Sequence, residues 1–153
     1  MKNQYIGLIL IATVWLSSCS LFHTEPHANI TLTSAQYLNP DINGRPSPVV
    51  IIIYQLKNAY NFKQADSTSL MANSGSILQG DLIDKNSIEI RPDSTQSIIQ
   101  KLDPDTQYLG IVAEYRNSTT ESWHKVVQLD SSGGERADIT INLESQGFTV
   151  TTS

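Results

Sequence analysis

The chain has 153 residues, of which 10 are basic and 15 acidic, and a formal net charge of −5. The length is that of one domain with a sizeable core. The acidic balance argues against nucleic acid or an anionic lipid surface as the main partner, because both require clustered lysine or arginine. A single cysteine leaves no intrachain disulfide.

The first residues have the features of an export signal. Lys2 is followed by the apolar run 6–16, which at about 1.5 Å of helical rise per residue is too short for a hydrocarbon core of roughly 30 Å. The small residues Ser17 and Ser18 come next. We therefore predict a cleaved signal peptide over residues 1–18.

Cys19 is the predicted lipid attachment site. The pattern Leu-Ser-Ser-Cys at residues 16–19 resembles a lipobox, in which the thiol accepts diacylglycerol and the new α-amino group is then acylated. Several acyl chains anchor stably, since each buried methylene contributes about 0.8 kcal/mol. The alternative is a secreted protein with a stray or buried thiol. Ser20 resembles the signal for transfer to the outer membrane.

Residues 19–28 are predicted to form a lipidated tether, and residues 29–153 one folded domain. The tether lacks apolar periodicity and contains Pro26. It can span at most roughly 30 Å. The domain would then lie close to the membrane.

The domain has the pattern of short strands separated by turn residues. The β-branched block 49–56 is predicted to be a central strand covered on both faces. Strands are predicted at 30–38, 49–56, 87–91, 96–102, 108–116, 123–129, 137–143 and 148–151. Residues 59–78 predict one or two short helices, with Asp66 or Ser67 as the N-cap. The fold class is therefore all-β, an antiparallel β-sandwich of seven or eight strands with a small helical insertion.

The connection between the first two strands is the strongest candidate for a binding element. It reads Asn39, Pro40, Asp41, Ile42, Asn43, Gly44, Arg45, Pro46, Ser47 and Pro48. It is long for a hairpin, and its prolines restrict it, so little entropy would be lost on docking a partner. The alternative is a merely irregular connection. Arg45 is the predicted charged contact, because its planar fork suits carboxylates and carbonyls.

Two aromatic residues are predicted to be structural. The stretch 102–108 resembles a tyrosine corner, in which the Tyr108 hydroxyl would bond to the backbone a few residues upstream; the alternative is an ordinary turn before a strand. Trp123 lies in a predicted strand together with other aromatic positions, Tyr54 and Tyr115. Core packing explains them better than a carbohydrate-binding platform.

The sequence offers no recognisable catalytic or metal site. His23, His27 and His124 lack zinc-ligand spacing. A nucleophile elbow, a phosphate-binding glycine loop and a His-Glu-x-x-His run are absent from the sequence. We predict that the protein is not an enzyme and has no metal or cofactor apart from the covalent lipid on Cys19. An envelope hydrolase is the least favoured alternative.

Several motifs together resemble the TssJ lipoprotein family of type VI secretion systems. They are the lipobox Cys19, Leu38-Asn39-Pro40-Asp41, Gly44-Arg45-Pro46-Ser47-Pro48-Val49-Val50, Ile53-Tyr54-Gln55-Leu56-Lys57, Phe62, Ala65-Asp66, Gly80-Asp81-Leu82, residues 110–116 and Trp123. The resemblance covers nearly all of the chain after the signal peptide.

The resemblance implies a transthyretin-like β-sandwich anchored in the outer membrane and facing the periplasm. It also implies binding to the periplasmic C-terminal domain of TssM, within the membrane complex that contains TssL and TssM. The expected contact is the loop between the first two strands, here residues 39–47. The alternative function is a periplasmic lipoprotein module that binds a peptide or another ligand.

Overall fold

The computed structural model describes residues 25–117, 123–129 and 136–153. The predictions for the signal peptide, for Cys19 and for the tether up to residue 24 lie outside this part of the chain. The predicted end of the tether at residue 28 is wrong, because His27 and Ala28 already belong to the first strand and Ala28 is buried. Within it, no helix is long and apolar enough to cross a membrane.

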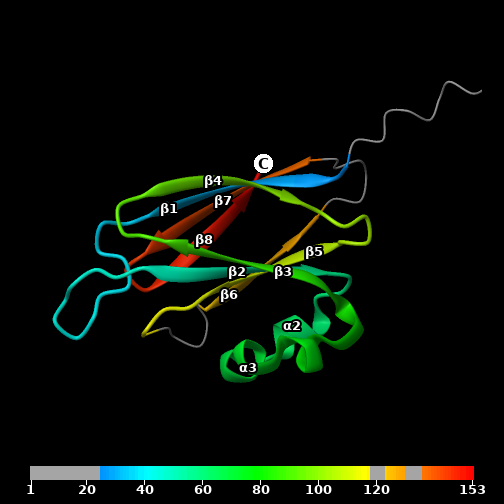
Figure 1. Cartoon of the computed structure of the whole chain (residues 1–153), viewed down its shortest axis with the longest axis horizontal. Coiled ribbons are helices and arrows are strands. Elements are labelled where there is room, and N and C mark those ends of the chain that lie inside the picture. Colours follow the sequence, from blue (N-terminus) through cyan, green and yellow to red (C-terminus); the bar gives the residue numbers. More distant parts are fainter. Residues whose placement is uncertain (1–24, 118–122, 130–135) are drawn as a thin grey trace, which may run out of the picture.

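The described residues form two four-stranded sheets packed face to face (Figure 1). The elements are β1 His27–Ser34, β2 Val49–Leu56, α2 Tyr60–Gln64, α3 Ser67–Leu78, the 3₁₀ turn η1 Gln79–Asp81, β3 Leu82–Ile90, β4 Thr95–Lys101, β5 Tyr108–Ala113, β6 His124–Gln128, β7 Arg136–Glu144 and β8 Gly147–Thr152. The first sheet has the order β4-β1-β7-β8 and the second β3-β2-β5-β6. The predicted β-sandwich with a helical insertion is confirmed.

One strand pair differs from the predicted antiparallel arrangement. β1 and β7 run parallel, in a register from His27 opposite Arg136 to Ser34 opposite Leu143, whereas the other pairs are antiparallel. The side-chain pattern of a strand records which face is buried and not the direction of its neighbour. The sequence therefore could not reveal this pair.

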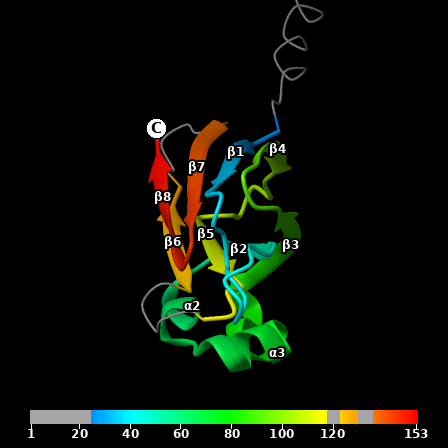
Figure 2. The same cartoon turned by 90° about the vertical axis from the view of Figure 1, so that its left-hand side faces the viewer.

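β2 is central in its sheet and is covered on both faces, as predicted. Ile51 and Ile53 point into the core between the two sheets. Tyr54 and Leu56 point into a second core between the outer face of this sheet and the helices. Figure 2 shows α2 and α3 on the side of the β3-β2-β5-β6 sheet that faces away from the other sheet. This double coverage explains why the strand is almost continuously apolar.

The helical insertion begins as the sequence predicts. The Asp66 carboxylate accepts a hydrogen bond from the Ser69 backbone N–H at 2.9 Å, so Asp66 is the N-cap of α3. The helices bury Phe62, Leu70 and Leu78 in the second core. Both observed helices fall within the predicted range 59–78.

The predicted tyrosine corner at Tyr108 is not formed among the described residues. The Tyr108 side chain packs beside the second core, and no described group forms a hydrogen bond with its hydroxyl. Tyr115, seven residues later, is buried and lies with its hydroxyl 2.6 Å from the Gly147 carbonyl and 3.1 Å from the Glu144 carbonyl. The tyrosine that bonds to the backbone thus ties the end of β5 to the β7–β8 turn.

Replacing Tyr115 with phenylalanine is expected to destabilise the domain by about 1–3 kcal/mol, because it leaves a buried carbonyl without its donor. Burial raises the pKa of Tyr115, so the hydroxyl remains a donor at neutral pH. Urea denaturation measures the effect. Tyr108→Phe is the matched control and should change the unfolding free energy little; equal losses in the two variants would contradict this assignment.

Candidate functional site

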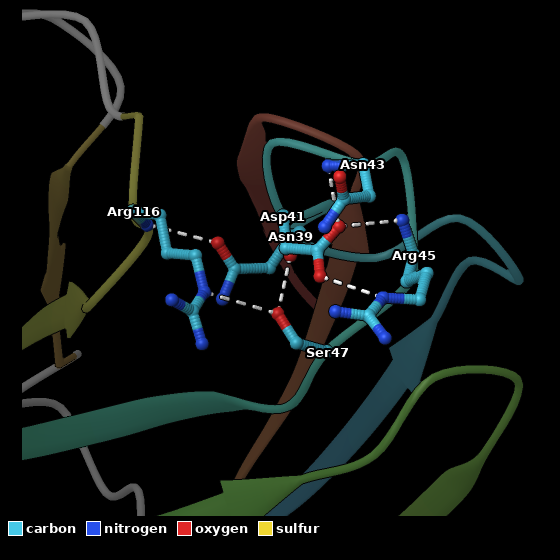
Figure 3. A network of polar contacts seen from close by, with 6 residues as sticks. All are labelled: Asn39, Asp41, Asn43, Arg45, Ser47 and Arg116. Carbon is cyan, nitrogen blue, oxygen red and sulfur yellow. Dashed lines mark hydrogen bonds and ion pairs between the residues drawn. The ribbon is translucent and has the colours of Figure 1, made fainter.

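The β1–β2 loop, defined as residues 35–48, is fixed at its base by Asn39 (Figure 3). The side chain is 4% exposed. Its Nδ2 donates to the Pro48 carbonyl at 2.9 Å, and its Oδ1 accepts from the Arg116 backbone N–H at 2.9 Å. The Asn39 N–H donates to the Ser145 carbonyl at 3.2 Å. One residue therefore joins both sides of the loop to the segment after β5 and to the β7–β8 turn.

Ser47 closes the loop above this base. Its hydroxyl donates to the Asn39 carbonyl, and its backbone N–H donates to the Leu38 carbonyl at 3.0 Å. Arg116 Nε donates to the Ser47 hydroxyl oxygen at 3.3 Å. Leu38 is fully buried in the core between the sheets. The two sides of the loop are thus bonded to each other and to the body of the domain.

The tip of the loop is organised by the Asp41 carboxylate. Oδ1 accepts from the backbone N–H groups of Asn43 and Arg45, at 2.8 and 2.9 Å, and Oδ2 accepts from Arg45 Nε at 2.9 Å. The Asp41 N–H donates to the Arg45 carbonyl at 2.9 Å. Gly44 has a φ of 74°, a value that glycine adopts without strain. Asp41 therefore closes the tip into one compact turn.

The loop residues divide into supports and exposed groups. Asn39 is buried, and Pro40, Asp41 and Ser47 are partly buried; residues 42–46 are exposed. Asn39 was predicted to contact a partner, but its side chain is buried and bonds to Pro48 and to Arg116 within the chain. Arg45 was predicted to be the charged contact of the loop. Its guanidinium is paired with Asp41, and 75% of its side chain is exposed.

The Asp41 pKa is lowered from its usual value near 3.8, chiefly because the Arg45 N–H bonds to the carboxylate. The ionised Asp41 carboxylate therefore stabilises the tip fully at pH values above its usual pKa. This stabilisation is lost as the pH falls through the lowered pKa. An NMR titration of the carboxyl carbon should show Asp41 ionising below 3.8. Arg45→Ala should raise the pKa only in part, because the backbone donors remain; a wild-type value above 3.8 would contradict this.

The loop lies at the opposite end of the domain from the point where the tether enters (Figure 1). β1 starts at His27 and runs for 8 residues, a length of roughly 26 Å, before the chain turns into the loop. The two features that the sequence singled out, an N-terminal tether and a projecting loop, are therefore separated by the length of the sandwich.

Two residues of this site were not found from the sequence. Tyr37, placed in a predicted strand, lies in the loop and is 64% exposed. Arg116 supports the loop from a position 77 residues away from Asn39 in the sequence. The position of Tyr37 in a polar stretch next to prolines could have indicated its exposure. No local feature of the sequence indicates the role of Arg116.

Trp123 is buried in the second core, and its ring centroid lies 4.1 Å from that of His124. Within the described ranges, no group of three or more histidine, cysteine, aspartate or glutamate side chains could hold a metal ion. Among the described residues, the domain is a β-sandwich with a helical cover, and the β1–β2 loop projects from it with hydrogen bonds at its base and its tip.

Comparison with known proteins places this domain in a family. The family model of type VI secretion lipoproteins, described by the names SciN, VasD, EvfM and TssJ, matches residues 26–146. The chain belongs to this family. No match was found in the search of curated protein sequences.

Solved structures of similar proteins share the fold. The crystal structure of the lipoprotein TssJ1 from Pseudomonas aeruginosa is 29% identical, with a TM-score of 0.78, over 84% of this chain and 97% of that one. Serratia marcescens Lip, a membrane-bound component of the type VI secretion system, is 19% identical, with a TM-score of 0.76, over 84% and 99% of the two chains. A chain in a structure described as the TssM C-terminal domain from EAEC is 21% identical, with a TM-score of 0.69, over 82% and 97%.

Proposed function

We propose that the chain is an outer-membrane lipoprotein of the type VI secretion membrane complex and binds the periplasmic C-terminal domain of TssM through the β1–β2 loop. The observation that carries this proposal is the internal support of the loop by Asn39 and Asp41. Membership of the secretion lipoprotein family supports it. A structure described by the name of the TssM C-terminal domain also contains a chain of this fold.

A supported loop suits binding because its shape is set before the partner arrives. Ordering a flexible loop on association reduces affinity, and a loop already held in one conformation avoids most of that loss. The side chains of Asn39, Asp41 and Ser47 form hydrogen bonds with four backbone groups of the loop. Residues 42–46 then remain exposed for contact.

The arrangement of the domain fits an anchor. Acyl chains on Cys19 would hold the N-terminal tether at the membrane, and the loop at the far end of the sandwich would face away from it (Figure 1). The chain would act by position and affinity, joining the outer membrane to a periplasmic partner, and no chemical step is required of it.

Cys19→Ser is expected to prevent lipid attachment, release the protein from the membrane fraction and abolish secretion, while the domain stays folded. Cell fractionation, circular dichroism and a secretion assay measure the three outcomes. Normal secretion by a variant confirmed to be unlipidated and released would refute the anchoring role.

A pull-down with the periplasmic domain of TssM tests the binding role. The chain should retain that domain, and a variant lacking residues 43–46 should lose it while keeping its circular dichroism spectrum and melting temperature. Replacing residues 43–46 by four glycines keeps the loop length and serves as a second variant. Retention of the TssM domain by both variants would contradict the proposal that the tip of the loop is needed for binding.

A further inference from the structure

The β1–β2 loop carries two of the five large apolar or aromatic side chains that are exposed among the described residues. Tyr37 is 64% exposed and Ile42 is 101% exposed. The other three, Tyr60, Met71 and Ile99, lie on α2, α3 and β4. Single exposed apolar residues are ordinary on protein surfaces, so their position rather than their exposure decides what they can do.

Tyr37 and Ile42 both belong to parts of the loop whose backbone is held by neighbouring contacts. Tyr37 directly precedes Leu38, which is fully buried, and Asn39, which forms the base of the loop. Ile42 lies inside the Asp41 turn, between the carboxylate and the Asn43 N–H that bonds to it. Because the turn is closed from within, Ile42 cannot fold back onto the domain without breaking these bonds. Its apolar surface is therefore held in water.

Arg45 is less suited to the same role. Its guanidinium and its backbone N–H both bond to the Asp41 carboxylate, so an acidic group on a partner would have to compete with Asp41. Exposed ion pairs contribute little and are screened by salt. The arrangement makes Arg45 a positioning residue for the tip.

We propose that Tyr37 and Ile42 are the main contacts of the loop, and that the partner receives them in an apolar pocket. This inference rests on the proposed function, in which the partner is the C-terminal domain of TssM. Aromatic side chains that become fully desolvated dominate the energetics of many interfaces. Such an interface is expected to show a negative heat-capacity change on binding and a weak dependence on salt.

The chain offers controls of the same residue types elsewhere on its surface. Tyr60 is 68% exposed, close to the 64% of Tyr37, and Ile99 is 76% exposed against 101% for Ile42. Calorimetric titration of the detergent-solubilised full chain with the TssM C-terminal domain should compare Tyr37→Ala with Tyr60→Ala, and Ile42→Ala with Ile99→Ala. Each loop variant should weaken binding about tenfold or more, and each control by less than about twofold. Arg45→Ala should weaken binding less than Ile42→Ala.

The outcomes separate this inference from the function on which it rests. Unchanged affinity in Tyr37→Ala and Ile42→Ala, with binding lost on removal of residues 43–46, would overturn the apolar contact and leave the loop as the interface. A steep fall in wild-type affinity between low and high salt would overturn it as well. Absence of binding by the wild-type chain would overturn both the inference and the proposed function.

Discussion

Gly110→Ala is expected to destabilise the domain by about 1–3 kcal/mol, as overpacking of a filled core does. A Cβ at this position would lie 2.6 Å from two atoms of the Phe62 ring, closer than carbon atoms approach in proteins. The ring cannot easily move away, because Phe62 is fully buried, with Tyr54 and His124 on it at centroid distances of 5.5 and 5.7 Å. Chemical denaturation measures the loss.

A double-mutant cycle identifies the cause. Phe62→Leu removes the ring and should be destabilising on its own, since it leaves part of the second core empty. The added alanine then has room, so Gly110→Ala in the Phe62→Leu background should cost clearly less than in the wild type. Equal costs in the two backgrounds would show that the clash with Phe62 is not the reason that position 110 is glycine.

Asn39→Ala is expected to have the second large effect, on stability and on partner binding together. It leaves the Pro48 carbonyl and the Arg116 N–H without their partner in two partly buried hydrogen bonds. A fully buried unsatisfied group costs about 1–3 kcal/mol, which is the upper limit for each of these two groups. Asn39 also has a φ of 44°, which asparagine tolerates better than alanine. The loop would lose its base, so affinity for the TssM domain should fall along with the unfolding free energy.

Two controls separate these effects. Asn39→Gly removes the same side chain but accepts the positive φ, so it should recover part of the stability lost in Asn39→Ala while binding remains weak. Asn43→Ala changes an exposed asparagine of the same loop, which bonds to Asp41 through its backbone N–H. It should leave the fold unchanged. Wild-type stability in Asn39→Ala would contradict the role of Asn39 as the base.

The sequence predicted the features that depend on neighbouring residues. The β-branched block at 49–56 became β2 with its predicted bounds, because a strand covered on both faces must be apolar throughout. Asp66 caps α3 because its carboxylate reaches an N–H group three residues ahead. The prolines of the 39–48 segment exclude a regular strand, so a loop at this position could also be predicted from the sequence.

The features that the sequence missed depend on contacts between distant segments. Asn39 meets Arg116 across 77 positions, and Tyr115 meets Gly147 across 32. The prediction that Tyr108 bonds to the backbone was therefore wrong, and Tyr115, just after β5, forms such bonds instead. The Asp41 turn was partly visible as an aspartate followed by Asn-Gly, but the pairing of Arg45 with that aspartate was not.

An NMR titration of the isotopically labelled chain with the unlabelled C-terminal domain of TssM tests the central claim most directly. We expect the largest changes at the Ile42 methyl groups, at Tyr37 and at the backbone amides of residues 42–46, with β8 and α3 nearly unchanged. Changes confined to α2 and α3 or to β8, with the Ile42 signals unmoved, would contradict the assignment of the β1–β2 loop as the binding element.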